Sequence, residues 1–403
     1  MREAVIVSAC RTAVGKANRG SLVHTRPDDM AAVVIAEAVK RAGIKPEQVE
    51  DVVIGCAMPE AEQGMNVARL AVCLAGFPDE VPAMTINRFC SSGMQAIWNL
   101  AADIIAGMID IGVAGGTETM TMIPMGGNKI VPNIKLAHER PGAYSSMGQT
   151  SENVAMKHKV SREDQDKFAL DSNLKAAKAV AEGCFKEQIV PLPTFKYDGK
   201  GGKKEFVYEV DEGPRGDANL KAMAKLKPAF ANPKTTKEGH GTGTAANSSQ
   251  MSDGAAAVVV MSREKADELG IKPLARIHGI KTVGLEPEYM GMGPSLAIPA
   301  LMEKVGKPLG ITLDDIGAFE INEAFASQAV ACCRELGIDG DPRVNPNGGA
   351  IALGHPLGCT GAKLTTQLVY HLRDKNLKWG IVSMCIGGGM GAAGLFENLQ
   401  YKE

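Results

Sequence analysis

The sequence predicts an α/β protein made of two similar halves, and three observations support this. Short apolar runs alternate with amphipathic helical segments, an order typical of parallel or mixed sheets covered by helices on both faces. An acidic turn followed by an apolar run occurs twice, at residues 49–56 and 313–320. Each copy is followed by a segment with helical spacing and then by a second apolar run, at residues 111–116 and 381–389. Each half therefore has the order strand, helix, strand.

Composition and charge narrow the class of protein. The chain has 403 residues, 45% of them hydrophobic and 22% charged, which is typical of a globular protein with two or three domains. A net charge of −2 and a pI near 6.4 do not predict binding to nucleic acid or to an anionic membrane surface. No apolar run approaches the ~20 residues that a membrane helix needs, so no membrane span is expected. Nine cysteines without a C-x-x-C pair predict neither a disulfide framework nor a structural zinc site, and they favour a reducing, cytoplasmic location.

The first half places Cys90 between a strand and a helix. Residues 83–86 are predicted to form the strand, and apolar residues recur at helical spacing from Met94 to Met108. Ser91 and its neighbour Ser92 suit a helix start, so the Cys90 sulfur is expected beside unpaired backbone N–H groups and the positive end of the helix dipole.

That position favours a thiolate at Cys90 but does not suffice for a nucleophile. A helix end supplies roughly 1 kcal/mol, which is less than the ~1.4 kcal/mol of one pKa unit. Cys90 therefore needs a base. The alternative is an inert core thiol, because free cysteine is among the most buried residue types.

Residues 121–250 differ in composition from both halves and are predicted to form an inserted loop domain. They are rich in Lys, Pro, Asn and Gly. Ser161 and Asp164 match a capping box, which predicts a helix over residues 162–182. Three lysines in the following basic tail are interpreted as solvated charges rather than phosphate ligands: Lys225, Lys227 and Lys234.

The second half contains the best candidate for the missing base. His355 lies in a glycine-rich run and precedes Pro356. The proline disfavours helical geometry at His355 and Gly354 lets the backbone bend sharply, so the imidazole is expected in a loop. The helix that follows is predicted to continue through about Leu372. An isolated histidine is more often structural, but Cys90 lacks a base.

Two further residues at strand ends could carry chemistry. Cys385 ends an apolar run and is followed by the glycine run 387–389. This glycine run has neither Walker A residues nor G-x-G-x-x-G spacing, so it does not predict nucleotide binding. Its backbone N–H groups could instead approach a reacting carbonyl oxygen, as an oxyanion hole requires. Asn322 places an amide at another strand-to-helix junction, where alone it would be a helix cap.

Taken together, four segments resemble the active-site motifs of the thiolases. They are Asn87-Arg88-Phe89-Cys90-Ser91-Ser92-Gly93, Asn322-Glu323-Ala324-Phe325-Ala326, Gly354-His355-Pro356 and Cys385-Ile386-Gly387-Gly388-Gly389-Met390-Gly391. The resemblance covers essentially the whole chain. Residues 147–155 and 382–385 are most similar to sequence segments of the degradative 3-ketoacyl-CoA thiolases, which are acetyl-CoA acyltransferases.

The resemblance implies a fold of two duplicated α/β domains in the five-layered α-β-α-β-α arrangement, with an inserted loop domain. Residues 1–120 and 251–271 would form the N-terminal thiolase domain and residues 272–403 the C-terminal one. Residues 121–250 would form the loop domain that binds CoA and the acyl chain. A homodimer or homotetramer is implied, and a partner in a β-oxidation multienzyme complex is left open.

The resemblance also implies the reaction. CoA, as co-substrate, cleaves a 3-ketoacyl-CoA to acetyl-CoA and a shortened acyl-CoA, or the reverse Claisen condensation occurs. No cofactor is permanently bound and no metal is used. Cys90 would be the acylated nucleophile, and His355 would take its proton and stabilise an oxyanion together with a water held by Asn322. Cys385 would move the proton on the acetyl α-carbon and activate the CoA thiol. The N–H groups of Cys90 and Gly387 would form a second oxyanion hole.

The CoA-contacting loop departs from the family's pattern. Ser249 falls where the family's pantetheine-contacting serine lies, and Met147 and Phe325 complete the expected substrate-binding residues. Ser146 stands where short-chain thiolases commonly carry a histidine, so we expect room for a medium or long acyl chain beside Met147. Four residues are unusual for the family and make CoA affinity less predictable than the chemistry: Gly243, Ala246, Gln250 and Ser252.

Three alternatives stay open at this point. An acetyl-CoA C-acetyltransferase that forms acetoacetyl-CoA would use the same residues. A decarboxylating ketoacyl synthase would have a histidine in place of Cys385. A catalytically silent acyl-CoA or lipid carrier would not need all four of Cys90, Asn322, His355 and Cys385, which are present.

Overall fold

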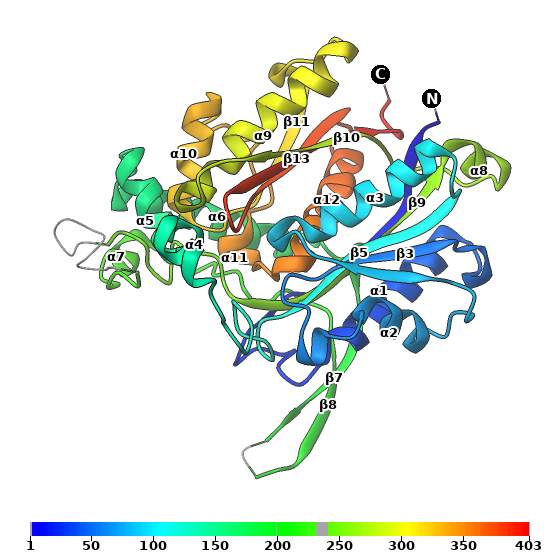
Figure 1. Ribbon diagram of the computed structural model, residues 1–403, viewed down its shortest axis with the longest axis horizontal. Helices are drawn as coiled ribbons and strands as arrows, with labels where there is room; N and C mark the ends of the chain where they lie inside the picture. Colours follow the sequence, from blue (N-terminus) through cyan, green and yellow to red (C-terminus); the bar gives the residue numbers. More distant parts are fainter. Residues whose placement is uncertain (1, 199, 231–240, 403) are drawn as a thin grey trace.

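A mixed sheet of eleven strands forms the centre of the computed structural model, which describes residues 2–198, 200–230 and 241–402 (Figure 1). Lys234 lies outside the described residues. Nine strands follow the order β11-β12-β13-β10-β1-β9-β5-β3-β4, while β2 pairs with β9 and β6 with β1. The strands are β1 (Ala4–Thr12), β2 (Gly15–Lys16), β3 (Asp51–Gly55), β4 (Ala83–Ile86), β5 (Ile111–Thr119), β6 (Ile189–Val190), β9 (Ser252–Ser262), β10 (Ala275–Gly284), β11 (Ile316–Ile321), β12 (Trp379–Ile386) and β13 (Met390–Asn398).

The two halves of the sheet repeat one pattern of strand pairing. In the first half, β1 and β5 pair with β9 antiparallel, and β5 pairs with β3 parallel. In the second half, β10 and β12 pair with β13 antiparallel, and β12 pairs with β11 parallel. The halves join where β1 meets β10 antiparallel. The duplication predicted from residues 49–56 and 313–320 is confirmed, because these runs contain β3 and the first five residues of β11.

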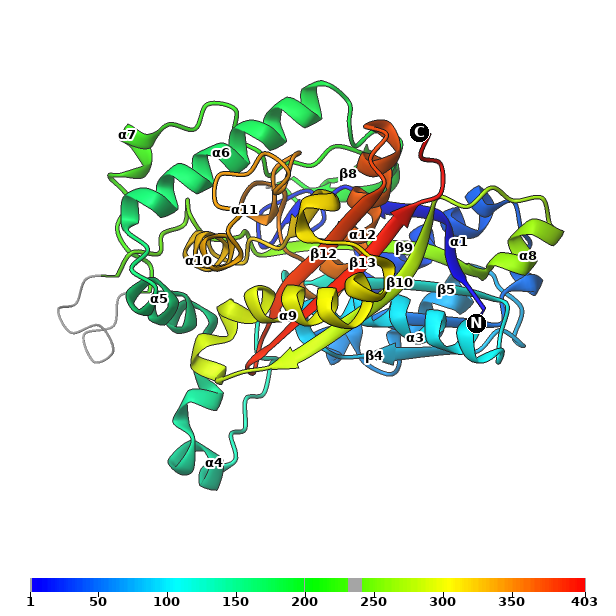
Figure 2. The same ribbon diagram turned by 90° about the horizontal axis from the view of Figure 1, so that it is seen from above.

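Helices cover both faces of the sheet and form a middle layer between its halves (Figure 2). In the middle layer, α3 (Ser92–Ala106) packs against α12 (Leu357–Asp374). On the outer faces, α1 (Pro27–Ala42) packs on β9, β5 and β1, and α9 (Gly293–Leu301) packs on β13 and β10. The remaining helices nearby are α2 (Val67–Leu74), α8 (Arg263–Glu268), α10 (Ala326–Leu336) and α11 (Ala350–Leu353).

Alternation along the strands explains this layering. In β9, Val259 packs in the core shared with α1, whereas Val258 and Val260 pack in the core shared with α3 and α12. Successive strand residues point to opposite faces, so a continuously apolar strand is buried from both sides. The two middle helices approach closely at Gly361, where an added Cβ would lie 2.3 Å from the backbone nitrogen of Met94.

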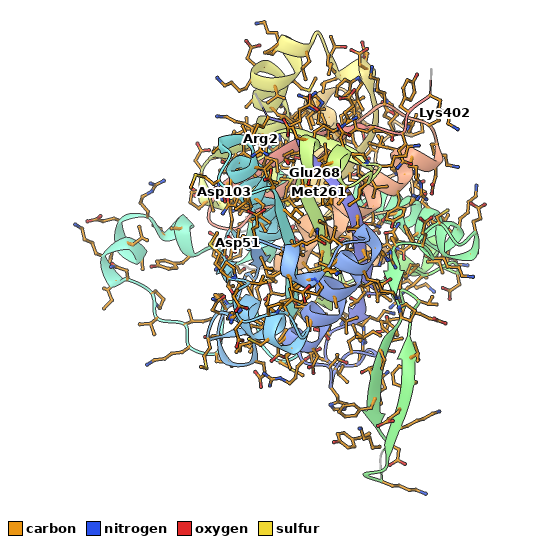
Figure 3. The ribbon with its side chains drawn as sticks, turned by 90° about the vertical axis from the view of Figure 1, so that its right-hand side faces the viewer. Arg2, Asp51, Asp103, Met261, Glu268 and Lys402 are labelled. Carbon is orange, nitrogen blue, oxygen red and sulfur yellow. The ribbon has the colours of Figure 1, made fainter. Side chains whose placement is uncertain are left out.

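The segment between β5 and β9 contains the predicted helix and two projections. Its helices and strands are α4 (Ile134–Glu139), α5 (Met147–Lys157), α6 (Arg162–Ala181), β7 (Leu192–Tyr197), β8 (Lys203–Tyr208) and α7 (Leu220–Met223). The capping box is confirmed, since the Asp164 N–H donates to Ser161 Oγ over 3.1 Å. The β7–β8 hairpin and the segment around α4 project from the body in different directions (Figure 3). Lys225 and Lys227 are exposed, as expected.

None of the helices in the described ranges is both long and apolar enough to cross a membrane.

Candidate active site

Cys90 sits in a strained turn between β4 and α3. The turn is a short 3₁₀ helix, η3 (Phe89–Ser91). It follows β4, the strand that the sequence predicts at residues 83–86. Phe89 has φ +43°, a left-handed conformation that is costly for a residue with a bulky side chain. Ser92 holds the turn, because its Oγ accepts the Arg88 N–H over 2.8 Å and donates to the Phe89 carbonyl over 2.7 Å. Cys90 is thus held in the site by a fixed, strained backbone.

The Cys90 thiol is neutral in this environment. Burial raises its pKa to about 12, and the charge of Glu118 adds to the increase. The backbone N–H groups of Gly387 and of Cys90 itself lie at the sulfur and lower the pKa, but they do not offset burial. The helix-end effect that favours a thiolate is therefore outweighed, and ionisation requires a group that removes the proton. Two backbone N–H groups that converge on one point are the kind of donor pair that an oxyanion hole requires.

His355 is oriented by a hydroxyl that the sequence analysis did not single out. Its Nδ1 lies 2.5 Å from Thr360 Oγ1, and this hydroxyl also donates to the Pro356 carbonyl over 2.9 Å. Because a hydroxyl has one proton and the carbonyl can only accept, Thr360 accepts the Nδ1 proton of His355. Nε2 therefore keeps its lone pair. Burial, followed by the charge of Lys363, lowers the pKa of His355 to about 3, so the imidazole is a neutral base.

Asn322 contacts the unprotonated nitrogen of His355, which accepts from its side-chain amide. Its Nδ2 lies 3.3 Å from His355 Nε2, and its backbone N–H donates to the Ser383 carbonyl over 2.9 Å. The other amide atom, Oδ1, is buried and has no partner among the described residues. An amide oxygen of this kind can hold a water beside the imidazole. The structure therefore brings Asn322 and His355 together, and the water-holding role of Asn322 stays a prediction.

Cys385 lies at the end of β12, next to Cys90. Burial, and then the charge of Cys90, raises the pKa of Cys385 well above its usual range. The Cys385 side chain packs with Met290 and Ala324, and half-buried Met147 and Phe325 border this cluster. Two neutral, buried thiols therefore lie beside each other at this end of β12.

The remaining predicted residues lie around this centre. A Cβ added to Gly387 would be 3.6 Å from the Phe89 ring and 3.8 Å from the Met147 sulfur, which places these three residues together. The Phe325 ring packs edge to face on Phe230, with centroids 5.7 Å apart. Half-buried Ser249 donates its backbone N–H to the Ala324 carbonyl over 3.0 Å, beside Phe325.

Ser146, from which room for a medium or long acyl chain is expected, is an exposed helix-capping residue. It is exposed and forms the N-cap of α5, where its Oγ accepts the Gln149 N–H over 3.4 Å. The Gln149 side-chain oxygen in turn accepts the backbone N–H of Ser146 over 3.0 Å. A serine favours this position because it caps a helix well. The Ser146 side chain is thus engaged in capping α5, and the preference for medium or long acyl chains stays a prediction.

Two buried charged residues support the site without having been predicted. Glu118 accepts the N–H groups of Ala57 over 2.7 Å and of Gly358 over 2.8 Å, so it ties the loop after β3 to the start of α12. Lys363 is fully buried on α12 and its Nζ lies 3.3 Å from the Gly354 carbonyl oxygen. A charged residue inside an apolar helical stretch is the signal that could have revealed Lys363.

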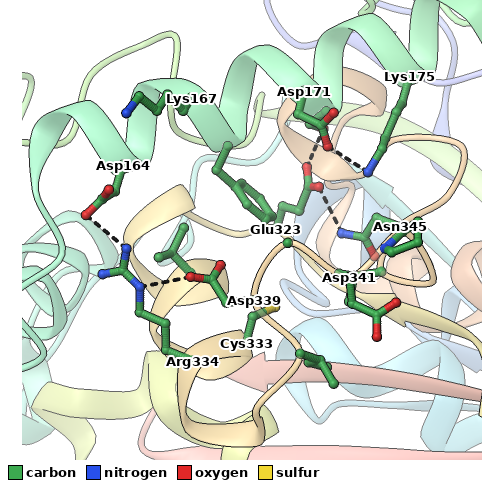
Figure 4. A pocket seen from close by; sticks show the side chains of 17 residues that line it. Asp164, Lys167, Asp171, Lys175, Glu323, Cys333, Arg334, Asp339, Asp341 and Asn345 are labelled. Atoms are coloured by element: carbon green, nitrogen blue, oxygen red, sulfur yellow. Dashed lines mark hydrogen bonds and ion pairs between the residues drawn. The ribbon is translucent and has the colours of Figure 1, made fainter. Parts of the chain in front are cut away.

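A cavity of about 510 Å³ lies behind the Asn322 segment, between α6, α10 and residues 339–345 (Figure 4). Glu323 forms part of its wall and accepts Ser172 Oγ–H over 2.6 Å and Asn345 Nδ2–H over 2.8 Å. Two ion-pair groups also line it: Arg334 with Asp164 and Asp339, and Lys175 with Asp171. The lining of the cavity does not include Cys90, His355 or Cys385, and the two hydrogen bonds in its wall anchor Glu323, the residue next to Asn322.

The chain belongs to the thiolase family. Residues 4–264 match the family model of the thiolase N-terminal domain and residues 271–398 that of the C-terminal domain. A 3-ketoacyl-CoA thiolase of Bacillus subtilis (strain 168) is 53% identical over 401 residues, covering 98% of this chain and 100% of the relative. The peroxisomal 3-ketoacyl-CoA thiolase A of Mus musculus is 46% identical, covering 98% and 91%. The crystal structure of the Bacillus anthracis acetyl-CoA acetyltransferase superposes with a TM-score of 0.87 at 40% identity, covering 99% of each chain.

Proposed function

We propose that this protein is a 3-ketoacyl-CoA thiolase, an acetyl-CoA C-acyltransferase that uses CoA to cleave a 3-ketoacyl-CoA. The observation that carries the proposal is that two buried thiols, Cys90 and Cys385, lie beside each other, while Asn322 contacts His355 and is bonded through its backbone to Ser383 in the strand that carries Cys385. The two 3-ketoacyl-CoA thiolases reported above, at 53% and 46% identity, support the same assignment.

The first half of the reaction transfers the acyl group to Cys90. His355 Nε2 takes the proton of the Cys90 thiol, and the sulfur attacks the 3-keto carbon of the substrate. The bond between carbons 2 and 3 then breaks, and its electron pair forms the enolate of acetyl-CoA. The Cys385 thiol donates its proton to carbon 2 of this enolate. Acetyl-CoA then leaves, and an acyl thioester remains on Cys90.

The second half returns the acyl group to CoA. The Cys385 thiolate takes the proton of an incoming CoA thiol, whose sulfur attacks the Cys90 thioester. The Cys90 sulfur leaves and recovers its proton from His355, which restores both thiols and the neutral imidazole. The N–H groups of Cys90 and Gly387 stabilise the oxyanion on the Cys90-bound carbon, and Asn322 with a water and His355 stabilises the thioester oxygen of acetyl-CoA.

CoA is a co-substrate in this proposal, and the segment of residues 121–250 supplies its binding surface. Ser249 is assigned to the pantetheine chain, while Met147 and Phe325 border the acyl group. The packing of Met147 and Phe325 around Cys385, together with the backbone contact of Ser249 with Ala324, supports these assignments. No permanently bound cofactor and no metal takes part in the proposed steps.

A second candidate is an acetyl-CoA C-acetyltransferase that forms acetoacetyl-CoA. It is favoured by the name of the Bacillus anthracis structure, whose TM-score is 0.87. The two functions differ in acyl length rather than in catalytic residues. Thiolysis rates for four-, eight- and twelve-carbon 3-ketoacyl-CoA substrates separate them, because each additional buried methylene contributes ~0.8 kcal/mol in a pocket that accepts it. A kcat/KM that falls steadily with length would favour the second candidate.

We also propose that the protein is a cytoplasmic homodimer or homotetramer. In this proposal it acts in β-oxidation and associates with a multienzyme partner. All nine cysteines are free, which suits a reducing compartment. The edge strand β4 has no buried residue, and apolar side chains are exposed near it: Met65 (90% exposed), Leu70, Leu74 and Met84. An apolar sheet edge of this kind favours pairing with another copy. Sedimentation equilibrium of the wild type and of Met84→Lys tests the assembly.

The covalent step has a direct test. Wild-type enzyme mixed with acetyl-CoA, quenched in acid and digested should carry the acetyl label on the Cys90 peptide alone. Cys90→Ala should carry none. A label on Cys385 would reverse the two roles, and the absence of any label together with the absence of thiolysis would contradict the proposed function.

A further inference from the structure

Residues 247–252, here called the strap, connect two parts of the site. The strap leads from the inserted segment into β9. At one end, the Asn247 carbonyl accepts the Ala326 N–H over 2.9 Å, and Ser249 donates its N–H to the Ala324 carbonyl over 3.0 Å. These bonds fix the strap against the segment that follows Asn322.

The other end of the strap holds the backbone of His355. The His355 N–H lies 3.2 Å from both the Gln250 carbonyl oxygen and Ser252 Oγ, and Ser252 Oγ donates to the same carbonyl over 2.7 Å. Gly354 packs directly on Ser252, since a Cβ added there would lie 2.4 Å from Ser252 Oγ. The loop that carries His355 therefore packs against Gln250 and Ser252 of the strap.

The side chain of Gln250 holds the helix that precedes this loop. Its Nε2 lies 3.2 Å from the carbonyl oxygens of Ile351 and Ala352 and 3.3 Å from that of Gly213. Carbonyls in the last turn of a helix have no partner within the helix. The Gln250 amide supplies donors to the end of α11 from outside and thereby fixes the point from which the chain turns toward His355.

We propose that Gln250 and Ser252 are positioning residues that set the place of His355 relative to Asn322 and Cys90. The proposal rests on the proposed function and explains two of the residues at which the chain departs from its family's usual loop. The strap bonds to the Asn322 segment at one end and to His355 at the other. The side chains of Gln250 and Ser252 therefore determine the separation of the base from the groups with which it exchanges protons.

Alkylation of Cys90 tests this positioning without any substrate. The rate of Cys90 alkylation by iodoacetamide, followed peptide by peptide by mass spectrometry, reports proton removal by His355. Exposed Cys73 in the same molecule gives the reference rate. Gln250→Met and Ser252→Ala should each slow Cys90 alkylation by about tenfold relative to Cys73, as expected for a small displacement of a catalytic group. His355→Ala gives the rate in the absence of the base.

Met251 offers a matched control within the strap. Its side chain is 51% exposed, so Met251→Ser should leave the alkylation rate unchanged. In thiolysis assays, Gln250→Met and Ser252→Ala should lower kcat in proportion to the alkylation rate, with KM for both substrates unchanged. Gln250→Glu places an acceptor against carbonyl oxygens and should lower kcat further than Gln250→Met.

Three results would overturn the positioning role. The first is an unchanged Cys90 alkylation rate in folded Gln250→Met and Ser252→Ala. The second is a rise in KM alone, which would give Gln250 and Ser252 a substrate-binding role like that proposed for Ser249. The third is a lower melting temperature with unchanged kcat, which indicates a structural role. If the wild type lacked thiolysis, the proposed function would fail, while the alkylation ratios would still decide the role of the strap.

Discussion

Thr360 and His355 form a contact in which the hydroxyl oxygen lies 2.5 Å from the imidazole Nδ1. Thr360 lies in the first turn of α12, and its hydroxyl proton is engaged by the Pro356 carbonyl. This arrangement fixes the tautomer that leaves Nε2 free, facing Asn322. A histidine with the other tautomer would carry a proton, not a lone pair, at Nε2 and could not act as the base of the proposed mechanism.

Thr360→Val should reduce kcat between about ten- and a hundredfold, because valine keeps the shape but removes the acceptor of the Nδ1 proton. Thr360→Ser retains the hydroxyl and should retain most of the activity. Steady-state thiolysis with both variants checks this. An unchanged kcat in Thr360→Val would mean that the tautomer is set by another group.

Cys385→Ser should lower turnover on the order of 10³-fold while Cys90 remains reactive, since a hydroxyl carries protons poorly near neutral pH. Cys90 alkylation and kcat are measured on the same preparation. Cys332→Ser is a matched control, because Cys332 is also buried and its thiol donates to the Gly291 carbonyl over 3.3 Å. Near-normal thiolysis by Cys385→Ser would contradict the two-thiol mechanism.

The contributions of His355 and His371 to stability should fall between pH 6.5 and about 4, because burial opposes the protonation of both side chains. Burial lowers the pKa of His355 to about 3, with the charge of Lys363 adding to the effect, and burial lowers that of His371 to about 4. Above pH 6.5 both residues are neutral in the folded and unfolded states and contribute nothing. Below it the unfolded chain binds protons that the folded chain does not, so the free energy of unfolding decreases by at most ~1.4 kcal/mol per pH unit for each histidine.

The difference between wild type and His355→Gln isolates one of these contributions. The two proteins share their other titrating groups, including Glu320, whose pKa burial raises to about 8 and which therefore acts in the opposite direction. Urea unfolding at pH 7.5, 6, 5 and 4.5 should show a shallower decrease in His355→Gln. Equal slopes for the two proteins would show that His355 titrates normally in the folded state.

Gly361→Ala should destabilise the fold by about 1–3 kcal/mol, because the methyl group would meet the backbone of α3. Alanine favours a helix interior by about 1 kcal/mol over glycine, but a Cβ 2.3 Å from the Met94 nitrogen forces α3 and α12 apart. Gly284→Ala is the control, since a Cβ there meets only the Gly389 carbonyl oxygen, 4.0 Å away. Thermal unfolding compares the two. A melting temperature for Gly361→Ala equal to that of Gly284→Ala would contradict the close packing of the middle layer.

Local patterns in the chain were sufficient for much of the fold. The strand at residues 83–86 has the predicted bounds, the helix after His355 ends at Asp374 against a predicted end near Leu372, and Ser161 caps α6. Each of these depends on residues within a few positions of one another. The repeated order of strand, helix and strand likewise follows from periodicity, and the family assignment follows from four short motifs that the comparisons confirm.

The division into residues 1–120 with 251–271, 121–250 and 272–403 stays a prediction, as do the roles of the individual site residues. Ser146 shows the limit of reasoning from one position, because whether a side chain lines a pocket or caps a helix depends on the direction in which its helix runs. The same holds for Gln250, which was noted as unusual without any indication of what it contacts.

The amino-acid sequence alone determined which chemical groups this protein has and in which local structures they lie: a cysteine at a helix start, a histidine in a loop, a second cysteine at a strand end. The tertiary structure decided their ionisation and their partners. Burial raises the pKa of Cys90 to about 12 and lowers that of His355 to about 3, and burial exists only once the layers have packed. Ser252 contacts His355 across 103 residues of chain, so no local pattern could place them together.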